Sequence, residues 1–222
     1  MQAVQLAQVV WDMVSQPDVA RTVDTVLGSA RAFTPAAEVG IFRVQGSCRV
    51  EIAGTSGPRA RRADELQLQY GEGPCLQAAL SRDVFLLADT RYDDRWPRLS
   101  PAVAELGWRS VLSLPLVMSD VPLGALNLYS STAASFGDEE VEWAQVFARH
   151  ASIALGLRIA EEGLQQAMAD QHVLGQAKGI VMERYGIDRD RAQEVLERQA
   201  EMSGRSLGDV ARTVIHTRRL PG

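Results

Sequence analysis

Lysine occurs once in this 222-residue chain, at Lys178, and every other basic side chain is an arginine. An ammonium group is a compact, strongly hydrated point charge on a flexible stem, and it suits contacts with phosphate oxygens. A lone lysine on a solvated helix face is the simpler alternative. Lys178 is therefore a candidate phosphate contact whose surroundings decide between the two.

Histidine and lysine are missing from most of the chain, and this excludes several kinds of catalytic site. The three histidines are His150, His172 and His216, so the first 149 residues hold none. That part has no His general base, no His ligand for a metal or haem, no phosphate-loop lysine and no Schiff-base amine. The histidine spacing forms no metal site. We expect no enzyme activity, no metal and no cofactor.

Two cysteines, Cys48 and Cys75, leave thiol chemistry as the remaining catalytic possibility. Cys75 lies at the start of a predicted helix, where a thiolate is stabilised. Two cysteines are too few for a disulfide framework and are typical of buried thiols in a reducing compartment. A small buried hydrophobic side chain is the favoured interpretation of Cys75.

Charge is divided unevenly along the chain. Residues 1–164 hold 14 arginines and 20 acidic residues, a net charge of −6, whereas residues 165–222 hold nine basic and eight acidic residues, a net charge of +1. Only the C-terminal part could contact a polyanion, and only through a local patch. No signal peptide and no apolar run of membrane-spanning length are apparent, which predicts a cytoplasmic protein without membrane contacts.

The elements that must position these residues begin with two amphipathic helices, over 4–14 and about 18–33. Turn signals and apolar runs predict strands over 39–44, 49–53, 84–87, 111–117 and 123–129, and helices over 74–82 and 101–106. The Gly- and Arg-rich segment 54–64 is predicted to be an exposed loop. Strands in hairpins with helices at both ends indicate an α+β fold with an antiparallel sheet.

A long helix of about 139–185 is predicted next, with two helices joined near Gly163 as the alternative. Apolar or small residues recur in a 3-4 alternation from Trp143 to Leu174, and His150 and Gln171 fill the two polar positions. This seam is typical of a coiled coil and predicts a homodimer through residues 143–174. Two short helices, capped by Asp188 and Ser206, follow and share a core with the end of the long helix.

Motifs in the N-terminal part resemble a GAF domain of actinobacterial type. They are Tyr70-Gly71-Glu72-Gly73-Pro74-Cys75, Asp94-Arg95-Trp96-Pro97, the segment 109–116 and the segment 123–129. The resemblance implies a sensing module over residues 1–160, built on a six-stranded antiparallel sheet with a ligand pocket over one face. Segments bordering that pocket hold Tyr70, Cys75, Trp96, Trp108, Asn127 and Tyr129, each of which is also explained as core. One GAF lineage reduces free methionine sulfoxide, so redox catalysis at Cys75 or Cys48 stays open.

The C-terminal part resembles an ANTAR domain. The residues that carry the likeness are Gln176-Ala177-Lys178-Gly179, the segment 180–184, Ala192-x-x-Val195-Leu196 and Asp209-Val210-Ala211. The resemblance implies an all-α, three-helix module over residues 161–222 that binds RNA hairpins in transcription antitermination. Lys178, Arg184 and Arg205 are assigned to phosphate and loop contacts, Gln176 to a base edge, and Gly179 to the same motif. Tyr185 is the sole aromatic after residue 160, so backbone and shape recognition should dominate.

Two functions follow from these observations. The first is a signal-responsive antiterminator in which the GAF domain senses a small molecule or other signal and the ANTAR domain binds hairpins in nascent RNA. The second is a ligand-binding module whose C-terminal helices dock a protein partner without touching RNA, and the near-neutral charge of residues 165–222 favours it.

Overall fold

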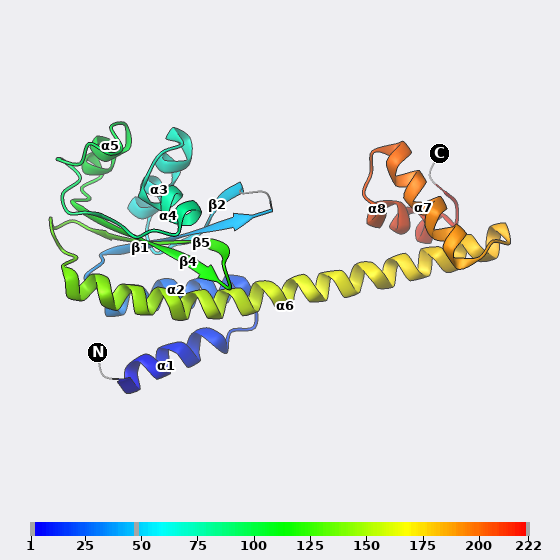
Figure 1. Ribbon diagram of the computed structural model, residues 1–222, viewed down its shortest axis with the longest axis horizontal. Helices are drawn as coiled ribbons and strands as arrows, with labels where there is room; N and C mark the ends of the chain where they lie inside the picture. Colours follow the sequence, from blue (N-terminus) through cyan, green and yellow to red (C-terminus); the bar gives the residue numbers. More distant parts are fainter. Residues whose placement is uncertain (1–2, 47–48, 221–222) are drawn as a thin grey trace. The chain divides into compact units, whose positions relative to one another are not determined.

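The computed structural model describes residues 3–46 and 49–220, so Cys48 lies outside the described residues. The chain divides into two compact units, with the boundary between Ala160 and Glu161. Figure 1 traces the order of the elements along the chain. Among the described residues, no helix is long and apolar enough to cross a membrane.

The N-terminal unit is built on one antiparallel sheet, which confirms the predicted fold class. Its strands lie in the order β2-β1-β5-β4-β3. Their bounds are Glu38–Gln45 for β1, Arg49–Thr55 for β2, Phe85–Leu87 for β3, Ser110–Met118 for β4 and Val121–Ser130 for β5. The described residues form five strands, one fewer than the six implied by the family resemblance.

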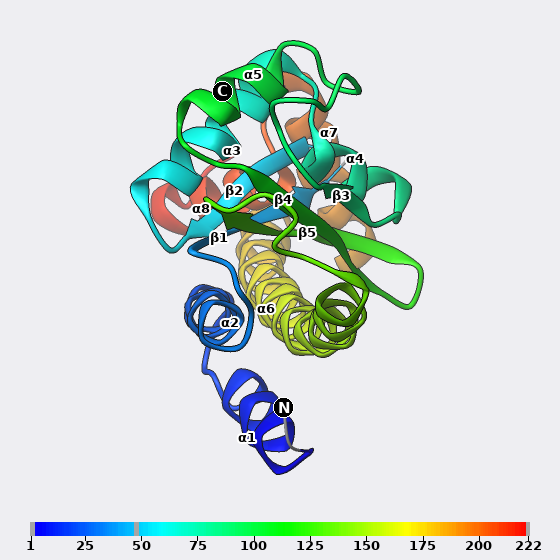
Figure 2. The same cartoon turned by 90° about the vertical axis from the view of Figure 1, so that its left-hand side faces the viewer.

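Helices cover both faces of this sheet (Figure 1, Figure 2). The helices α1 (Ala3–Val14), α2 (Val19–Phe33) and the first part of α6 (Asp138–Tyr185) belong to one face. The helices α3 (Pro58–Tyr70), α4 (Pro74–Ser81) and α5 (Leu99–Glu105) cover the other. Apolar side chains of β4 and β5 are buried toward both sides, as expected for central strands.

The prediction of an exposed loop over 54–64 is wrong. Strand β2 continues to Thr55, and α3 begins at Pro58, which sits at the first helical position after the N-cap Gly57. Proline is tolerated there because its missing N–H would have no intrahelical partner. Ala60, Ala63 and Leu66 follow at helical spacing and are buried. The intervening arginines gave the segment a polar composition that concealed this apolar face.

The helix α6 is continuous over Asp138–Tyr185, as predicted, without a break near Gly163. Its N-terminal part buries Ala144, Phe147, Ala151 and Leu155 against the sheet. Gly156 allows this approach, since a Cβ there would lie 2.4 Å from Met118 Sδ. The last part of α6 joins α7 (Arg189–Ser203) and α8 (Leu207–Thr217) in a separate core of the C-terminal unit.

The predicted caps hold the two short helices in place. The Asp188 carboxylate accepts from the Arg191 N–H, and Ser206 Oγ accepts from the Asp209 N–H. Gly204, with φ of 63°, ends α7 in a left-handed conformation that glycine adopts without strain. The buried side chains at the centre of this unit are Leu174, Ala177, Val181, Ala192, Leu196, Val210, Ala211 and Val214.

Candidate functional site

The residues predicted to contact RNA all lie in the C-terminal unit, but helical geometry divides them. Gln176, Lys178, Gly179 and Arg184 are on α6, and Arg205 lies just before α8. Successive residues of an α-helix are about 100° apart, so Gln176 and Gly179 are about 60° apart whereas Lys178 is about 160° from Gln176. The structure therefore brings Gln176 and Gly179 together and places Lys178 on the opposite flank of α6.

Gln176 and Gly179 line a hollow of about 670 Å³ between α6 and the C-terminal end of α8. The other lining residues are Ile180, Glu183, Ile215 and Arg218. The Gln176 amide nitrogen lies 3.0 Å from His172 Nε2, one turn earlier on α6. The isoleucines give the hollow an apolar surface, Gln176 and Glu183 add an amide and a carboxylate, and Arg218 adds a guanidinium group. These groups suit a nucleobase and its phosphate.

Basic side chains of this unit differ in whether they are already paired. The side chains of Lys178, Arg184 and Arg218 make no hydrogen bond or ion pair with the described residues. Arg205 Nη2 instead donates to Thr213 Oγ1 at 2.9 Å, and Arg212 pairs with the Asp209 carboxylate at 2.9 Å. The unpaired side chains can donate to a phosphate directly, whereas Arg205 must first release its hydrogen bond to Thr213. The sequence analysis missed Arg218, which follows the last residue of α8 in a region without a recognised motif.

The six residues predicted to border a ligand pocket lie on the side of the sheet covered by α3, α4 and α5. Trp96, Trp108 and Tyr129 share one buried cluster with half-buried Tyr70 at its edge. Cys75 belongs to an adjoining cluster. Asn127, the sixth, is fully buried on β5. All six side chains are thus buried or half-buried, with polar groups among them.

A buried carboxyl, Asp64 of α3, organises those polar groups and was missed by the sequence analysis. Its Oδ1 accepts from Tyr129 OH at 2.6 Å and from Asn127 Nδ2 at 2.8 Å. Asn127 Oδ1 accepts in turn from Ser113 Oγ, and Gln67 Oε1 accepts from the Cys75 N–H at 2.9 Å. These hydrogen bonds therefore tie α3 and α4 to β4 and β5 through the Asp64 and Gln67 side chains of α3.

Burial raises the pKa of Asp64 from 3.8 to about 7, because the ionised form loses its hydration. Hydrogen bonds from Tyr129 and Asn127 and the Arg61 charge oppose this rise, and the Glu65 charge adds to it. The pKa of Tyr129 is also raised, mainly by burial and then by the Asp64 charge. Asp64 is therefore a carboxyl whose protonation changes close to neutral pH.

Several buried polar atoms of this region find no hydrogen-bond partner among the described residues. They are Asp64 Oδ2, Trp96 Nε1, Trp108 Nε1 and Ser100 Oγ. Unpaired buried polar atoms cost about 1–3 kcal/mol each, so their concentration in one place requires an explanation. Two guanidinium groups cover the indoles, with Arg59 Cζ 4.0 Å from the Trp108 ring centroid and Arg95 Cζ 4.7 Å from that of Trp96.

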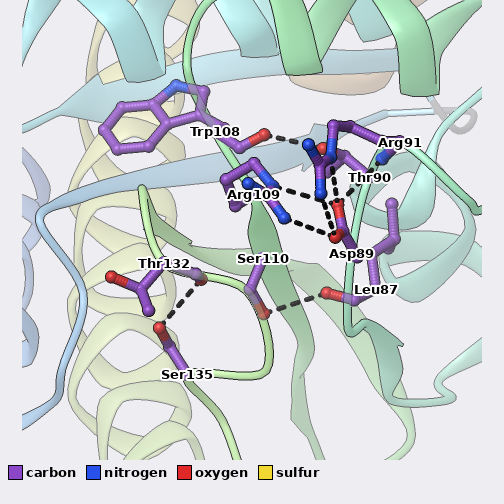
Figure 3. A network of polar contacts seen from close by, with 9 residues as sticks. All are labelled: Leu87, Asp89, Thr90, Arg91, Trp108, Arg109, Ser110, Thr132 and Ser135. Atoms are coloured by element: carbon purple, nitrogen blue, oxygen red, sulfur yellow. Dashed lines mark hydrogen bonds and ion pairs between the residues drawn. The ribbon is translucent and has the colours of Figure 1, made fainter.

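An ion-pair network fixes the loop after β3 against the start of β4 (Figure 3). The Asp89 carboxylate accepts from Arg109 at 2.6 Å and 3.1 Å, and Arg91 donates to it as well. The hydrogen bond from Arg109 holds the pKa of Asp89 well below its usual range. Thr90 Oγ1 donates to the Trp108 carbonyl at 2.7 Å, so the network also holds the backbone that positions the Trp108 indole.

Cys75 lies in the first turn of α4, but its side chain is fully buried. Burial and the nearby Asp64 carboxyl raise the pKa of the Cys75 thiol, opposing any stabilisation from the helix N-terminus. A thiol that stays protonated is a poor nucleophile. The placement agrees with the favoured interpretation of Cys75 as a small buried side chain.

Four apolar residues of the predicted coiled-coil seam form an exposed stripe on α6, whereas Trp143 packs against the core of the N-terminal unit and Leu174 is buried in that of the C-terminal unit. The exposed fractions are 39% for Val146, 50% for Ile153, 48% for Leu157 and 64% for Leu164. These residues are spaced by seven, four and seven positions, which keeps them in one row. The residues of α6 that pack on the sheet, such as Phe147 and Ala151, belong to a different face.

Among the described residues, no group of His, Cys, Asp and Glu could hold a metal ion. The three histidines are not buried, and all are on α6 or α8.

Comparison with protein families gives two matches. The GAF domain model matches residues 16–156, and the ANTAR domain model matches residues 162–215. No curated protein matches the chain.

Solved structures are similar over the N-terminal unit. The GAF domain of a phosphoenolpyruvate-protein phosphotransferase from Coxiella burnetii has 19% identity and a TM-score of 0.58, covering 71% of this chain and 94% of that one. The corresponding domain from Acinetobacter has 14% identity and a TM-score of 0.58, with coverages of 73% and 99%. Free methionine-R-sulfoxide reductase from Neisseria meningitidis, in complex with its substrate, has 16% identity and a TM-score of 0.56, with coverages of 70% and 89%. At these identities the likeness establishes the fold alone.

Proposed function

Because this chain belongs to the GAF domain family and carries an ANTAR domain after its GAF domain, we propose that it is a signal-responsive transcription antiterminator. Both matched domains are regulatory rather than catalytic and together describe a signal-responsive RNA-binding regulator. The ANTAR domain binds hairpins in nascent RNA, and binding prevents formation of a terminator. This activity belongs to the cytoplasm, where transcripts are made.

The observation that carries the proposal is the continuity of α6 from one domain into the next. The same helix packs on the sheet of the GAF domain and supplies Leu174, Ala177 and Val181 to the core of the ANTAR domain. A change in the register or pairing of such a helix alters the surface of the module that contains its end. Signal and output thus share one element.

RNA is held mainly through its backbone in this proposal. Lys178 and Arg184 contact phosphates because their charges are unpaired, and Arg205 joins them after releasing Thr213. Gln176 contacts a base edge from the hollow that it shares with Gly179. Because Gly179 has no side chain, the RNA strand can approach the helix backbone closely there.

The sensing site is the polar core beneath α3 and α5. Tyr70, Cys75, Trp96, Trp108, Asn127 and Tyr129 surround or join the network of Asp64, and its unpaired indole N–H groups are donors for a ligand acceptor. Opening this core requires movement of the covering helices, which would transmit binding to the sheet. A ligand that enters this core is a small molecule that takes the place of contacts between packed side chains.

A homodimer through residues 143–174 completes the proposal. The exposed stripe from Val146 to Leu164 has the spacing of a coiled-coil seam, and His150 and Gln171 occupy polar positions that set register. His150 Nδ1 is engaged with the Val146 carbonyl of its own helix at 2.8 Å, so its Nε2 is the atom that faces a partner.

A protein-docking function is the second candidate, and the charge of the C-terminal unit favours it. Residues 165–222 carry a net charge of only +1. Docking through apolar side chains would be almost insensitive to salt, whereas each phosphate contact of an RNA complex releases a counterion. Salt dependence therefore separates the two candidates.

The test is equilibrium binding of the full chain to a tandem-hairpin RNA at 50 mM and 200 mM salt. Raising the salt over this range is expected to weaken binding about threefold for each phosphate contact in the complex. Lys178→Ala or Arg184→Ala should lower the slope of log affinity against log salt concentration by about 1. Arg21→Ala is the matched control, since Arg21 lies on α2 and makes only an exposed contact with Asp18. Equal losses in the control and in the two variants would contradict these RNA contacts, and no binding of the RNA at either salt concentration would favour docking.

A further inference from the structure

A second hollow in the GAF domain lies on the opposite face of the sheet from the polar core. It has a volume of about 270 Å³ and is situated where α6 passes the outer edge of β4. β3 pairs with β4 only over Val111–Ser113, so the later residues of β4 have no strand neighbour on that side. Pro115 occupies this open edge, where the lack of an N–H leaves no ladder bond unmade.

The polar groups around this hollow are predominantly donors with positive charge. Arg82 and Arg149 contribute guanidinium groups, and Gln145 contributes an amide one turn before Arg149 on α6. The side chains of Arg149 and Gln145 make no hydrogen bond or ion pair with the described residues. Arg82 is already engaged by Asp120, whose carboxylate lies 3.1 Å from Nη1 and whose carbonyl oxygen accepts from Nη2 at 2.6 Å. Because the Asp120 side chain is 93% exposed, this pair is weak and can be exchanged for another anion.

The rest of the lining is apolar or already satisfied. Val84, Pro115 and Ala148 supply aliphatic surface. Ser152, also in the lining, is buried and donates to the Ala148 carbonyl at 2.7 Å while accepting from the Val117 N–H at 3.1 Å. The wall therefore offers aliphatic contacts beside two guanidinium groups and an amide, of which those of Arg149 and Gln145 are unpaired.

We propose that this hollow binds a small organic anion, a carboxylate or phosphate group carried on a short aliphatic body. The two guanidinium groups and the Gln145 amide hold the anionic head, because charge-assisted hydrogen bonds from arginine are the strongest available to it. The aliphatic wall takes the body. The site is separate from the polar core proposed for sensing and lies directly against α6, so its ligand contacts the helix that continues into the ANTAR domain.

Two arginines line this one hollow. The GAF part of the chain is acidic overall, with 20 acidic residues against 14 arginines over 1–164. Some of these arginines have carboxylate partners, as Arg109 does with Asp89, whereas the side chains of Arg31 and Arg49 make no ion pair with the described residues. Arg149 has none, although Glu142 lies two turns earlier on the same side of α6 and contributes nothing to the lining. An anion from solution supplies the missing partner.

Titration of the full chain at low salt with butyrate and butyl phosphate tests the proposal, using NMR chemical shifts or calorimetry. Butanol and butylammonium, which have the same body with a neutral or positive head, are the comparison ligands. We expect saturable binding of at least one anion and none of the comparison ligands. Equal binding of butanol, or no binding of either anion, would overturn the proposal.

Two substitutions locate the site without disturbing the core. Arg149→Gln removes a charge-assisted hydrogen bond and should weaken anion binding by about tenfold to hundredfold. Gln145→Glu should weaken anion binding at least about fourfold, because the new carboxylate repels the anion. This factor corresponds to two negative charges about 5 Å apart, even at the dielectric constant of water. Gln165→Glu makes the same charge change on an exposed part of α6 and Arg31→Gln on α2, and both should leave the affinity unchanged. Affinities unaltered in the Arg149 and Gln145 variants would place the anion elsewhere and refute the assignment.

Discussion

Replacing Asp64 by Asn should change the pH dependence of folding stability by an amount that the structure allows us to calculate. The carboxyl is fully buried, and burial raises its pKa from 3.8 to about 7. In the unfolded chain the carboxyl ionises near its ordinary value. Between these two pKa values the folded state holds a proton that the unfolded state has lost, so stability decreases as the pH rises.

The size of the effect follows from the two pKa values. Below pH 3.8 both states are protonated, and Asp64 imposes no penalty on folding. The penalty grows to about 1.7 kcal/mol at pH 5 and about 4.3 kcal/mol at pH 8, where it is nearly complete. The wild-type chain should therefore lose about 2.5 kcal/mol between pH 5 and pH 8 through this carboxyl alone.

The assay is urea denaturation of the wild type and of Asp64→Asn at pH 5 and pH 8. Titration of every other group cancels in the difference between the two proteins, and so does any fixed cost of the amide at this position. The stability of the variant relative to the wild type should rise by about 2.5 kcal/mol from pH 5 to pH 8. Asp94→Asn removes an exposed carboxylate and controls for the lost charge. A difference that is the same at both pH values would show that Asp64 is ionised in the folded state at pH 5, and the reasoning from burial would be wrong.

Four other substitutions test separate parts of the structure, with Gly163→Ala as the control for Gly179→Ala. Gly179→Ala should stabilise the chain by about 0.5–1 kcal/mol, because the added Cβ meets nothing within 4 Å, but it should weaken RNA binding. Gly163→Ala should stabilise α6 by the same amount and leave RNA binding unchanged. Thermal unfolding measures the stabilities of both variants, and gel shifts measure their RNA binding. Gly124→Ala should destabilise by more than about 3 kcal/mol, since φ is 157° and a Cβ would lie 1.8 Å from the Phe42 carbonyl oxygen, and a small loss in urea denaturation would contradict this. Leu157→Lys should convert the proposed dimer to a monomer in sedimentation velocity without unfolding it, because the side chain is 48% exposed; an unchanged sedimentation coefficient would exclude this seam as the interface.

Local patterns in the sequence were sufficient for most of the elements. The apolar spacing on α2, the continuity of α6 and the caps Asp188 and Ser206 all depend on residues within a few positions of one another. The motif around Gly73 and Pro74 likewise placed the start of α4 correctly. The prediction for the start of α3 was wrong because its exposed arginines outnumber its small buried residues, and small residues contribute little to a hydrophobic pattern.

The sequence by itself thus determined the order and type of most elements, the family resemblances, and the absence of His and Lys from the N-terminal part of the chain. Only the tertiary structure decided which charges meet. Asp64 reaches Asn127 and Tyr129 across 63 and 65 residues, and these partners and its burial set its pKa. The same holds for Arg149, which the fold leaves unpaired beside a hollow, and for Cys75, which the fold buries. The physical reason is that helix and strand formation depends on short-range periodicity, whereas hydration and electrostatic interactions depend on neighbours that are brought together only by folding.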